Sequence, residues 1–291
     1  MDLGIFLQFV VAGLSAGSIY ALIALGFGVI NNATGIVNFA QGDFAVIAAF
    51  LAYTLLVSLG WPYWLAFSAG VLLASMVGFF LWRFVLSYAK SKEIIFLVFI
   101  TVGFSIFLHG IIKEVWGKRP ITLPPLNYGY VKLGNLNFEV QTFWVIAATL
   151  SAFLVLHLFF KYTLWGKAIR AVAADTRAAA LMGIRVSRVI AGSFALAGAL
   201  GGLAGLLVAP LWPLSFESGV YIGLKGFAAA VLGGYGSFAG ALLGGLLLGL
   251  LEGIGGYFAS SFKNIIAYGI LFLVLLFRPQ GILGNNQEER L

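Results

Sequence analysis

Long apolar segments dominate the chain and are separated by short polar gaps. Runs of about 20 apolar residues, the length that crosses a bilayer as a helix, lie near 5–30, 43–59, 62–86, 94–112, 143–160 and 189–212. Beyond them the pattern is irregular, because the apolar stretch 226–256 is cut by GGYGS at 233–237 and the last run covers only 265–277. The pattern predicts an all-α polytopic membrane protein with about eight transmembrane helices, or up to ten if the broken segments re-enter the membrane.

Composition places these segments in a lipid bilayer. The chain has 291 residues, of which 62 % are hydrophobic and 9 % are charged, and its mean hydropathy is +1.04. A soluble globular domain is therefore excluded. The sequence has no cysteine, which excludes disulfides, thiol nucleophiles and cysteine-bound metals. The net charge of +7 comes from cations in the loops, where they orient a membrane chain, so nucleic acid is not an expected partner.

The distribution of basic residues predicts an orientation. The gap 161–188 holds six lysines and arginines against one acid, Asp175, and the positive-inside rule assigns it to the cytoplasm. Counting back five spans puts the N-terminus outside. The run 5–30 is expected to remain as a span, because no basic residue precedes it as in a signal peptide.

The same count makes residues 113–142 an extracytoplasmic loop. Its four cations and two glutamates fit the rule less well than the composition of 161–188 does. Prolines followed by alternating residues and a Gly134–Asn135 turn signal predict a short hairpin in this loop. The hairpin is either a connector or a docking surface for an external partner.

Thirty-eight glycines predict close packing between helices. Helices in lipid gain little from hydrophobic burial and associate through small residues that let their backbones approach. Glycines recur four residues apart in three regions, at Gly13 and Gly17, Gly201 and Gly205, and Gly240, Gly244, Gly245, Gly249 and Gly253. We expect tight helix contacts within the fold at these faces, with dimerisation through one of them as the alternative.

A polar interruption, NNATGIVNFAQGDF, separates the first two spans at 31–44. It is either a short cytoplasmic loop or a re-entrant segment whose unwound backbone lines a watery path. In the second case a polar solute finds hydrogen bonds at Asn31, Asn32, Asn38 and Gln41, while Asp43 caps the next helix. The broken stretch 228–245 is its counterpart in the second half of the chain.

Few residues offer other chemistry. Only Asp43 and Glu252 are acids within apolar spans, and an acid at membrane depth is a functional candidate, although glycines beside Glu252 would let it reach water near a helix end. The two histidines, His109 and His157, are expected to pack rather than to ligate or carry protons. No Walker GxxxxGK[ST], HExxH or GxSxG motif is present, so neither an enzyme nor a cofactor site in this chain is supported.

One polar gap contains a short helix with defined ends, ADTRAAALMGI at 174–184. Asp175 is a good N-cap, and the alanines, Leu181 and Met182 after it favour helix. Gly183 can adopt the left-handed conformation at the helix end. A helix of two turns is marginal by itself and must pack on something. It is a docking element for another protein or a cap lying on its own spans.

The segment that contains this short helix resembles a known family. LWGKAIRAVAADTRAAALMGIRVSRVIAGSFALAGALGGLAGLL at 164–207 is similar to the cytoplasmic loop and following span of permeases of high-affinity branched-chain amino acid ABC importers, the LivH type. Further similar stretches, in the same order, are GLSAGSIYALIALGFGVI, GIVNFAQGDF, KGFAAAVLGGYGSFAGALLGG and RPQGILG. The resemblance covers nearly the whole chain.

The resemblance implies one permease domain over 1–291 in the inner membrane, with the ABC importer permease fold. Its partners would be a second, LivM-like permease, two cytoplasmic ATPase subunits of the LivG and LivF type that bind ATP and magnesium, and a soluble extracytoplasmic amino-acid-binding protein. The short cytoplasmic helix would couple the ATPase to the spans. Carried over to this sequence, the coupling residues are Asp175, Arg177, Ala178, Leu181, Met182 and Gly183, with Ala178, Leu181 and Met182 as the buried docking face.

The function implied is ATP-driven import of leucine, isoleucine and valine. Another small solute, such as urea, an amide or another amino acid, is the alternative within the class. A proton-coupled secondary transporter using Asp43 and Glu252, or a solute channel, is the alternative outside it. Neither needs an ATPase, so both leave the capped helix at 175–183 without a role.

Overall fold

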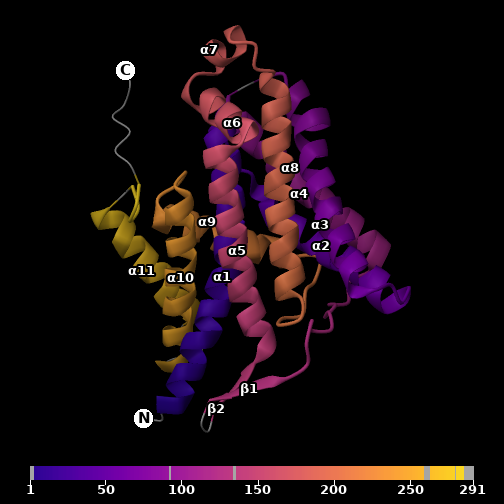
Figure 1. The fold of residues 1–291 in the computed structure, drawn as a ribbon, viewed down its shortest axis with the longest axis vertical. Coiled ribbons are helices and arrows are strands. Elements are labelled where there is room, and N and C mark those ends of the chain that lie inside the picture. Colours follow the sequence, from indigo (N-terminus) through magenta and orange to yellow (C-terminus); the bar gives the residue numbers. More distant parts are fainter. Residues whose placement is uncertain (1–2, 92, 134–135, 259–262, 279, 285–291) are drawn as a thin grey trace.

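The computed structural model describes the chain except for residues 1–2, 92, 134–135, 259–262, 279 and 285–291 (Figure 1). The helices are α1 Leu3–Thr34, α2 Asp43–Tyr53, α3 Tyr63–Phe80, α4 Ile94–Trp116, α5 Val140–Tyr162, α6 Leu164–Ala174, α7 Thr176–Leu181, α8 Val186–Val208, α9 Ser218–Gly233, α10 Phe238–Phe258 and α11 Lys263–Phe277. The strands are β1 Tyr130–Leu133 and β2 Leu136–Glu139. A π-helical turn extends α2 through Ser58, and a π-helical turn followed by a 3₁₀ turn extends α3 through Tyr88.

The helical architecture agrees with the apolar pattern. Within the described residues, seven helices are long and apolar enough to cross a membrane, and α9 is a shorter apolar helix of 16 residues. The interruption at GGYGS separates α9 from α10, as the sequence predicts. α11 has only 15 residues, which agrees with the short final run. Several boundaries differ by three or four residues: α1 continues past residue 30 to Thr34, α4 continues past 112 to Trp116, and the helix predicted from 143 begins at Val140. The helix predicted over 189–212 is Val186–Val208.

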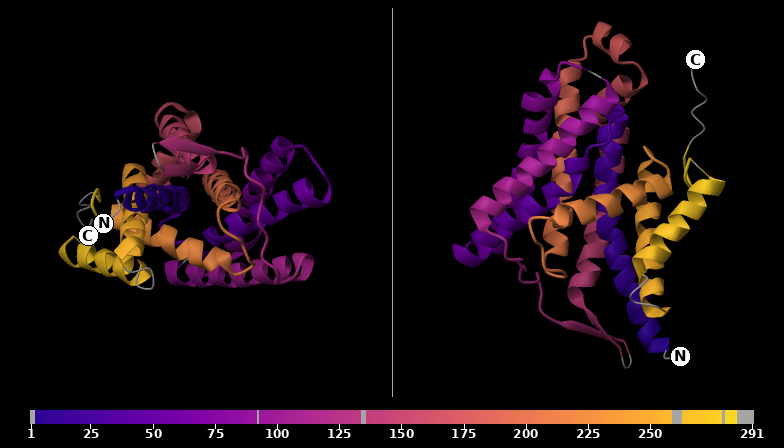
Figure 2. Two further views of the ribbon diagram at one scale, coloured as in Figure 1. Left: turned by 90° about the horizontal axis from the view of Figure 1, so that it is seen from below. Right: turned by 180° about the vertical axis from the view of Figure 1, so that it is seen from behind.

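α1 forms the centre of the molecule. It runs along the long axis and packs against α5, α8, α9 and α10 (Figure 1). The middle of α1 is apolar on all sides and is fully buried, as at Ile19, Leu22, Ile23 and Leu25. α9 lies across the molecule at a steep angle to α10 (Figure 2, right). α9 therefore differs from α1 and α10 in both length and direction.

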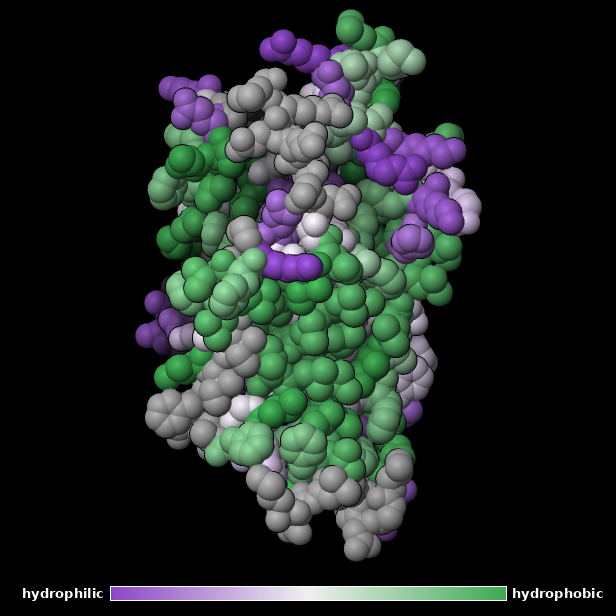
Figure 3. Space-filling model, turned by 90° about the vertical axis from the view of Figure 1, so that its left-hand side faces the viewer, coloured by the Kyte–Doolittle hydropathy of each residue, from purple (hydrophilic) through white to green (hydrophobic). Residues whose placement is uncertain are grey.

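The two ends of the molecule carry different elements. The described start of the chain and the hairpin lie at one end, and α7 lies at the other (Figure 1). β1 and β2 pair antiparallel with Leu133 opposite Leu136, so the predicted hairpin is confirmed, while its turn residues lie outside the described part. One side of the molecule shows a broad hydrophobic field, with most of its visible hydrophilic side chains towards the α7 end (Figure 3).

Glycines bring α1 and α10 into backbone contact. A Cβ placed on Gly13 would lie 2.6 Å from the Gly249 carbonyl oxygen, and one on Gly17 would lie 2.7 Å from that of Gly245. Real Cβ atoms do not approach so closely, so only glycine allows this spacing. The glycine faces of α8 and α10 meet α2 and α9 in the same way. The prediction of tight contacts within the fold is confirmed.

We expect Gly17→Ala to lower the yield of folded protein and its thermal stability. The added methyl meets a backbone carbonyl that cannot rotate away, and such overpacking costs about 1–3 kcal/mol. The control is Gly103→Ala in α4, where the new Cβ has no neighbour within 4 Å. Size-exclusion profiles and melting temperatures in detergent measure both variants. Equal melting temperatures for the two would contradict the packing argument.

Candidate functional site

The polar segment at 174–184 folds as predicted into a short helix that is capped at both ends. One carboxylate oxygen of Asp175, Oδ1, accepts hydrogen bonds from the backbone N–H groups of Arg177 (2.7 Å) and Ala178 (3.0 Å). These two bonds hold the pKa of Asp175 below its usual value. At the other end Gly183 has φ +83°, its N–H donates to the Ala180 carbonyl, and the next N–H donates to the Ala179 carbonyl. This is the Schellman ending that the sequence predicts.

The side chains of α7 divide into an inner and an outer face. Ala179 is only 4 % exposed and faces the rest of the chain. Leu181 and Met182 are 89 % and 83 % exposed, and Ala178 is also exposed. We call Ala178, Leu181 and Met182 the α7 surface. The helix thus rests on its own fold through one small residue and presents an apolar face outward, at the tip of the molecule (Figure 1).

α6, which the sequence reasoning missed, supports α7. Thr163 caps it by accepting from the Gly166 N–H (3.0 Å), and its hydroxyl donates to the Phe159 carbonyl (2.7 Å). Gly166, Ile169 and Val172 recur every three residues and are buried. The Thr163 cap and the three-residue spacing of these buried residues are the sequence signals that could have predicted α6. α6 holds α7 at a fixed position relative to the end of α5.

The interrupted segment between α1 and α2 is buried. Asn38 and Gln41 are fully inaccessible, and the amide nitrogen of Gln41 donates to the Ala197 carbonyl in α8 (2.9 Å). Gly42 fits against α9, where a Cβ would overlap the backbone of Gly219. These contacts contradict a short surface loop at Asn38–Gly42. The segment instead runs inside the helical fold between α1, α8 and α9.

Asp43 does not cap α2, so that prediction is wrong. The residue before it, Gly42, is the N-cap and already has helical angles, which places Asp43 inside the first turn with no side-chain cap bond. Its Oδ1 lies 2.7 Å from His109 Nε2 on α4. Sequence reasoning missed this pairing and expected His109 only to pack. The rule that a buried acid needs a partner, together with the scarcity of polar residues in α4, is the signal that could have found it.

Glu252 is largely buried, at 9 % exposed, and its carboxylate is paired. Lys225 Nζ lies 2.6 Å from Glu252 Oε1, and the Tyr20 hydroxyl donates to Oε2 (2.9 Å). Lys225 also donates to the Tyr20 oxygen (3.1 Å). These three side chains, the Glu252 triad, join α10, α9 and α1. Sequence reasoning missed Lys225, although it is a lone cation in an apolar helix.

The remaining predicted polar residues lie near the two interruptions. Asn31 and Asn32 belong to the last turn of α1, not to a loop. The Asn32 side chain donates to the Gly236 carbonyl (2.9 Å), which links the end of α1 to the break between α9 and α10. Four of the six predicted residues, Asn32, Gln41, Asp43 and Glu252, thus hydrogen-bond to parts of the chain far away in sequence. No group of three or more acids and histidines in the described part of the chain is arranged to hold a metal ion.

Comparison with known proteins decides the family. The model of the branched-chain amino acid transport system permease component family matches residues 9–276. The chain belongs to this family. It is 33 % identical to the high-affinity branched-chain amino acid transport system permease protein LivH of Escherichia coli, over 98 % of this chain and 97 % of that protein. It is 36 % identical to the corresponding protein BraD of Pseudomonas aeruginosa, over 98 % of both.

A solved structure supports the fold of this permease. PsaBC from Streptococcus pneumoniae in complex with Fab matches 94 % of the chain and 92 % of the solved one with a TM-score of 0.50. The sequence identity is 17 %, so this likeness concerns the fold alone. A permease component of an ABC transport system is a multi-pass membrane protein that is not itself catalytic and needs no cofactor of its own. It acts together with ATPase and binding-protein partners.

We expect Asp175→Ala in the permease to have a partial effect on coupled transport. The change removes the N-terminal cap, frays α7 and leaves the α7 surface chemically intact. Stimulated ATP hydrolysis by the assembled complex should fall to roughly half, and Asp175→Asn, which keeps an acceptor, is the control. Because the pKa of Asp175 is lowered, the cap is present at neutral pH and is lost only as the pH falls through that lowered pKa. A defect that appears only above neutral pH would contradict this role.

Proposed function

We propose that this permease carries leucine, isoleucine and valine into the cell, driven by ATP hydrolysis in two cytoplasmic ATPase subunits. The observation that carries the coupling part is the α7 surface, which is apolar, exposed and held on a helix closed at both ends. An exposed apolar patch on a rigid support is typical of a docking site. The solute is inferred from the names of LivH and BraD, which match nearly the whole chain.

The proposed orientation places α7 in the cytoplasm and the N-terminus and hairpin outside. The excess of cations in 161–188 supports it. The position of the hairpin at the end opposite α7 agrees with the same assignment (Figure 1). The α7 surface would then meet an ATPase, and the other end would meet a soluble amino-acid-binding protein. A second, related permease completes the assembly.

The proposed path for the solute follows the polar interruptions. Its candidate residues are Asn31, Asn32, Asn38, Gln41, Asp43 and Glu252. Three of them, Asn38, Gln41 and Asp43, each keep a buried side-chain atom without a hydrogen-bond partner among the described residues. Buried polar atoms without partners are costly, and a passing polar solute would supply the missing bonds.

Reconstitution tests the proposed function. The complete complex is purified with its native partners, placed in liposomes and supplied with ATP on the ATPase side and a labelled solute with the binding protein on the other. We expect ATP-dependent uptake of leucine, isoleucine and valine. Uptake of urea or another amino acid instead would replace the solute. Uptake that follows a proton gradient, ignores ATP and disappears in variants that stay folded with Asp43 and Glu252 as amides would replace the class.

A further inference from the structure

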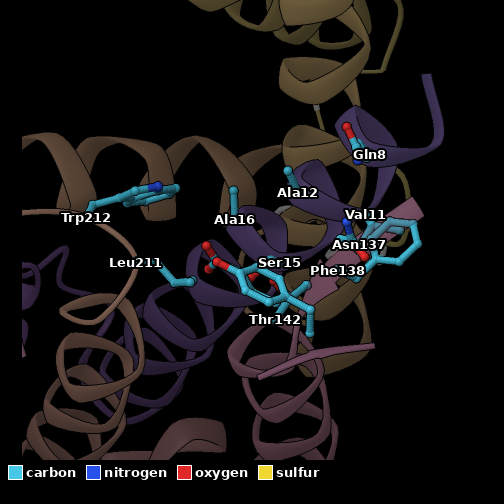
Figure 4. A pocket seen from close by; sticks show the side chains of 12 residues that line it. Gln8, Val11, Ala12, Ser15, Ala16, Asn137, Phe138, Thr142, Leu211 and Trp212 are labelled. Atoms are coloured by element: carbon cyan, nitrogen blue, oxygen red, sulfur yellow. The ribbon is translucent and has the colours of Figure 1, made fainter. Parts of the chain in front are cut away.

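A cavity of about 410 Å³ opens at the end of the molecule that carries the hairpin (Figure 4). Its walls come from α1, the hairpin, the start of α5 and the segment after α8. One face of α1 contributes Gln8, Val11, Ala12, Ser15 and Ala16, which follow the helical repeat. Small side chains on this face leave the space open. The volume lies within the range of small-molecule sites.

The cavity lining includes two buried hydroxyls, those of Ser15 and Thr142, of which the first lacks a hydrogen-bond partner among the described residues. Ser15 is 3 % exposed, and its hydroxyl has no partner among the described residues. Thr142, also buried, lies in the first turn of α5, a helix of 23 residues whose N-terminus faces the cavity through this residue. The N-cap, Glu139, makes no side-chain cap bond. The first N–H of α5, that of Val140, donates to the Gly129 carbonyl, so the N–H groups after it and the two hydroxyls are the donors that suit a carboxylate.

The rim combines one acid with apolar surface. The exposed Glu139 also lines the cavity and supplies a negative charge that suits an ammonium group. Trp212 and Leu211 lie on one side of the α1 face, and Phe138 and Asn137 lie on the other (Figure 4). The cavity thus offers an anion site, a cation site and an apolar wall within one small space.

We propose that this cavity is an entry subsite for a zwitterionic amino acid with an apolar side chain. The solute carboxylate lies at the start of α5 with Ser15 and Thr142, the ammonium group meets Glu139, and the side chain packs on Leu211 and Trp212. The inference rests on the proposed function, because it assumes that the permease carries branched-chain amino acids. It adds a place where the solute binds before it passes the buried residues.

Photolabelling tests the location directly. The two permeases assembled with their ATPase subunits, but without the soluble binding protein, are irradiated with a diazirine analogue of leucine. The labelled peptides are identified by mass spectrometry. We expect label in peptides that contain residues 8–16 and 211–212, removed by excess leucine and retained with excess glutamate. Label confined to other peptides, or label at these peptides that leucine does not remove, would overturn the subsite.

Matched variants separate this inference from the proposed function. Ala12→Leu should raise the leucine concentration that gives half-competition by about tenfold, because it fills the space, and Glu139→Gln by about threefold, the effect of losing an ion pair at an exposed carboxylate. The controls are Glu114→Gln and Ala147→Leu, which change exposed residues outside the cavity lining. Unchanged competition in the two cavity variants would overturn the subsite. Failure of the wild-type complex to import leucine would instead overturn the proposed function.

Discussion

Leu181→Arg leaves the permease folded and inserted but stops ATP-driven uptake. Leu181 is 89 % exposed, so its replacement removes no packing from the chain itself. When α7 is docked, the arginine would lie in an apolar groove of the ATPase, and burying an unpaired charge costs several kcal/mol. We expect uptake and solute-stimulated ATP hydrolysis to fall by tenfold or more, about 1.4 kcal/mol per factor of ten.

The control for this change is Leu164→Arg at the start of α6. Leu164 is also highly exposed, at 81 %, but lies outside the α7 surface. Uptake in liposomes, ATP hydrolysis and co-purification of the ATPase are measured for both variants. Normal uptake and normal ATP hydrolysis by the Leu181→Arg complex would refute docking through α7. Loss of the ATPase from the Leu181→Arg complex alone would support it most directly.

α7 could be predicted in detail because its signals are local. The Asp175 cap comes directly before the six-residue helix, and the left-handed Gly183 comes shortly after it. Both signals act on neighbouring backbone groups, so tertiary packing did not override them. The local signals alone do not say which face of the helix is free, and the docking face Ala178, Leu181 and Met182 came from the family resemblance. Ala178, Ala179 and Leu181 all favour helix, and it is the packing of α7 on α6 and α8 that leaves Ala179 as the one turned inward.

The buried polar residues show the opposite case. The sequence identified Asp43 and Glu252 as acids at membrane depth, but their partners lie 66 and 27 residues away along the chain. The assignment of Asp43 as a cap failed because Gly42 already has helical angles, a conformation that depends on its fit against α9. Residue types thus predicted where strong pairs would be needed, while helix packing decided which pairs formed.

The Glu252 triad should be needed for folding, and removing one charge from it should be worse than removing both. Glu252→Gln leaves the Lys225 ammonium largely buried without its carboxylate, and breaking a buried pair in this way costs about 3–5 kcal/mol. The double variant Glu252→Gln with Lys225→Met removes both charges and should restore the yield of folded protein and its melting temperature. A normal folded yield for Glu252→Gln alone would contradict the argument.

Uptake by the folded double variant then decides whether Glu252 also has a role in transport. Uptake that stays low keeps this residue on the proposed solute path, whereas uptake that returns with folding removes it from the path and leaves the triad as the tie that holds α9 to α1 and α10.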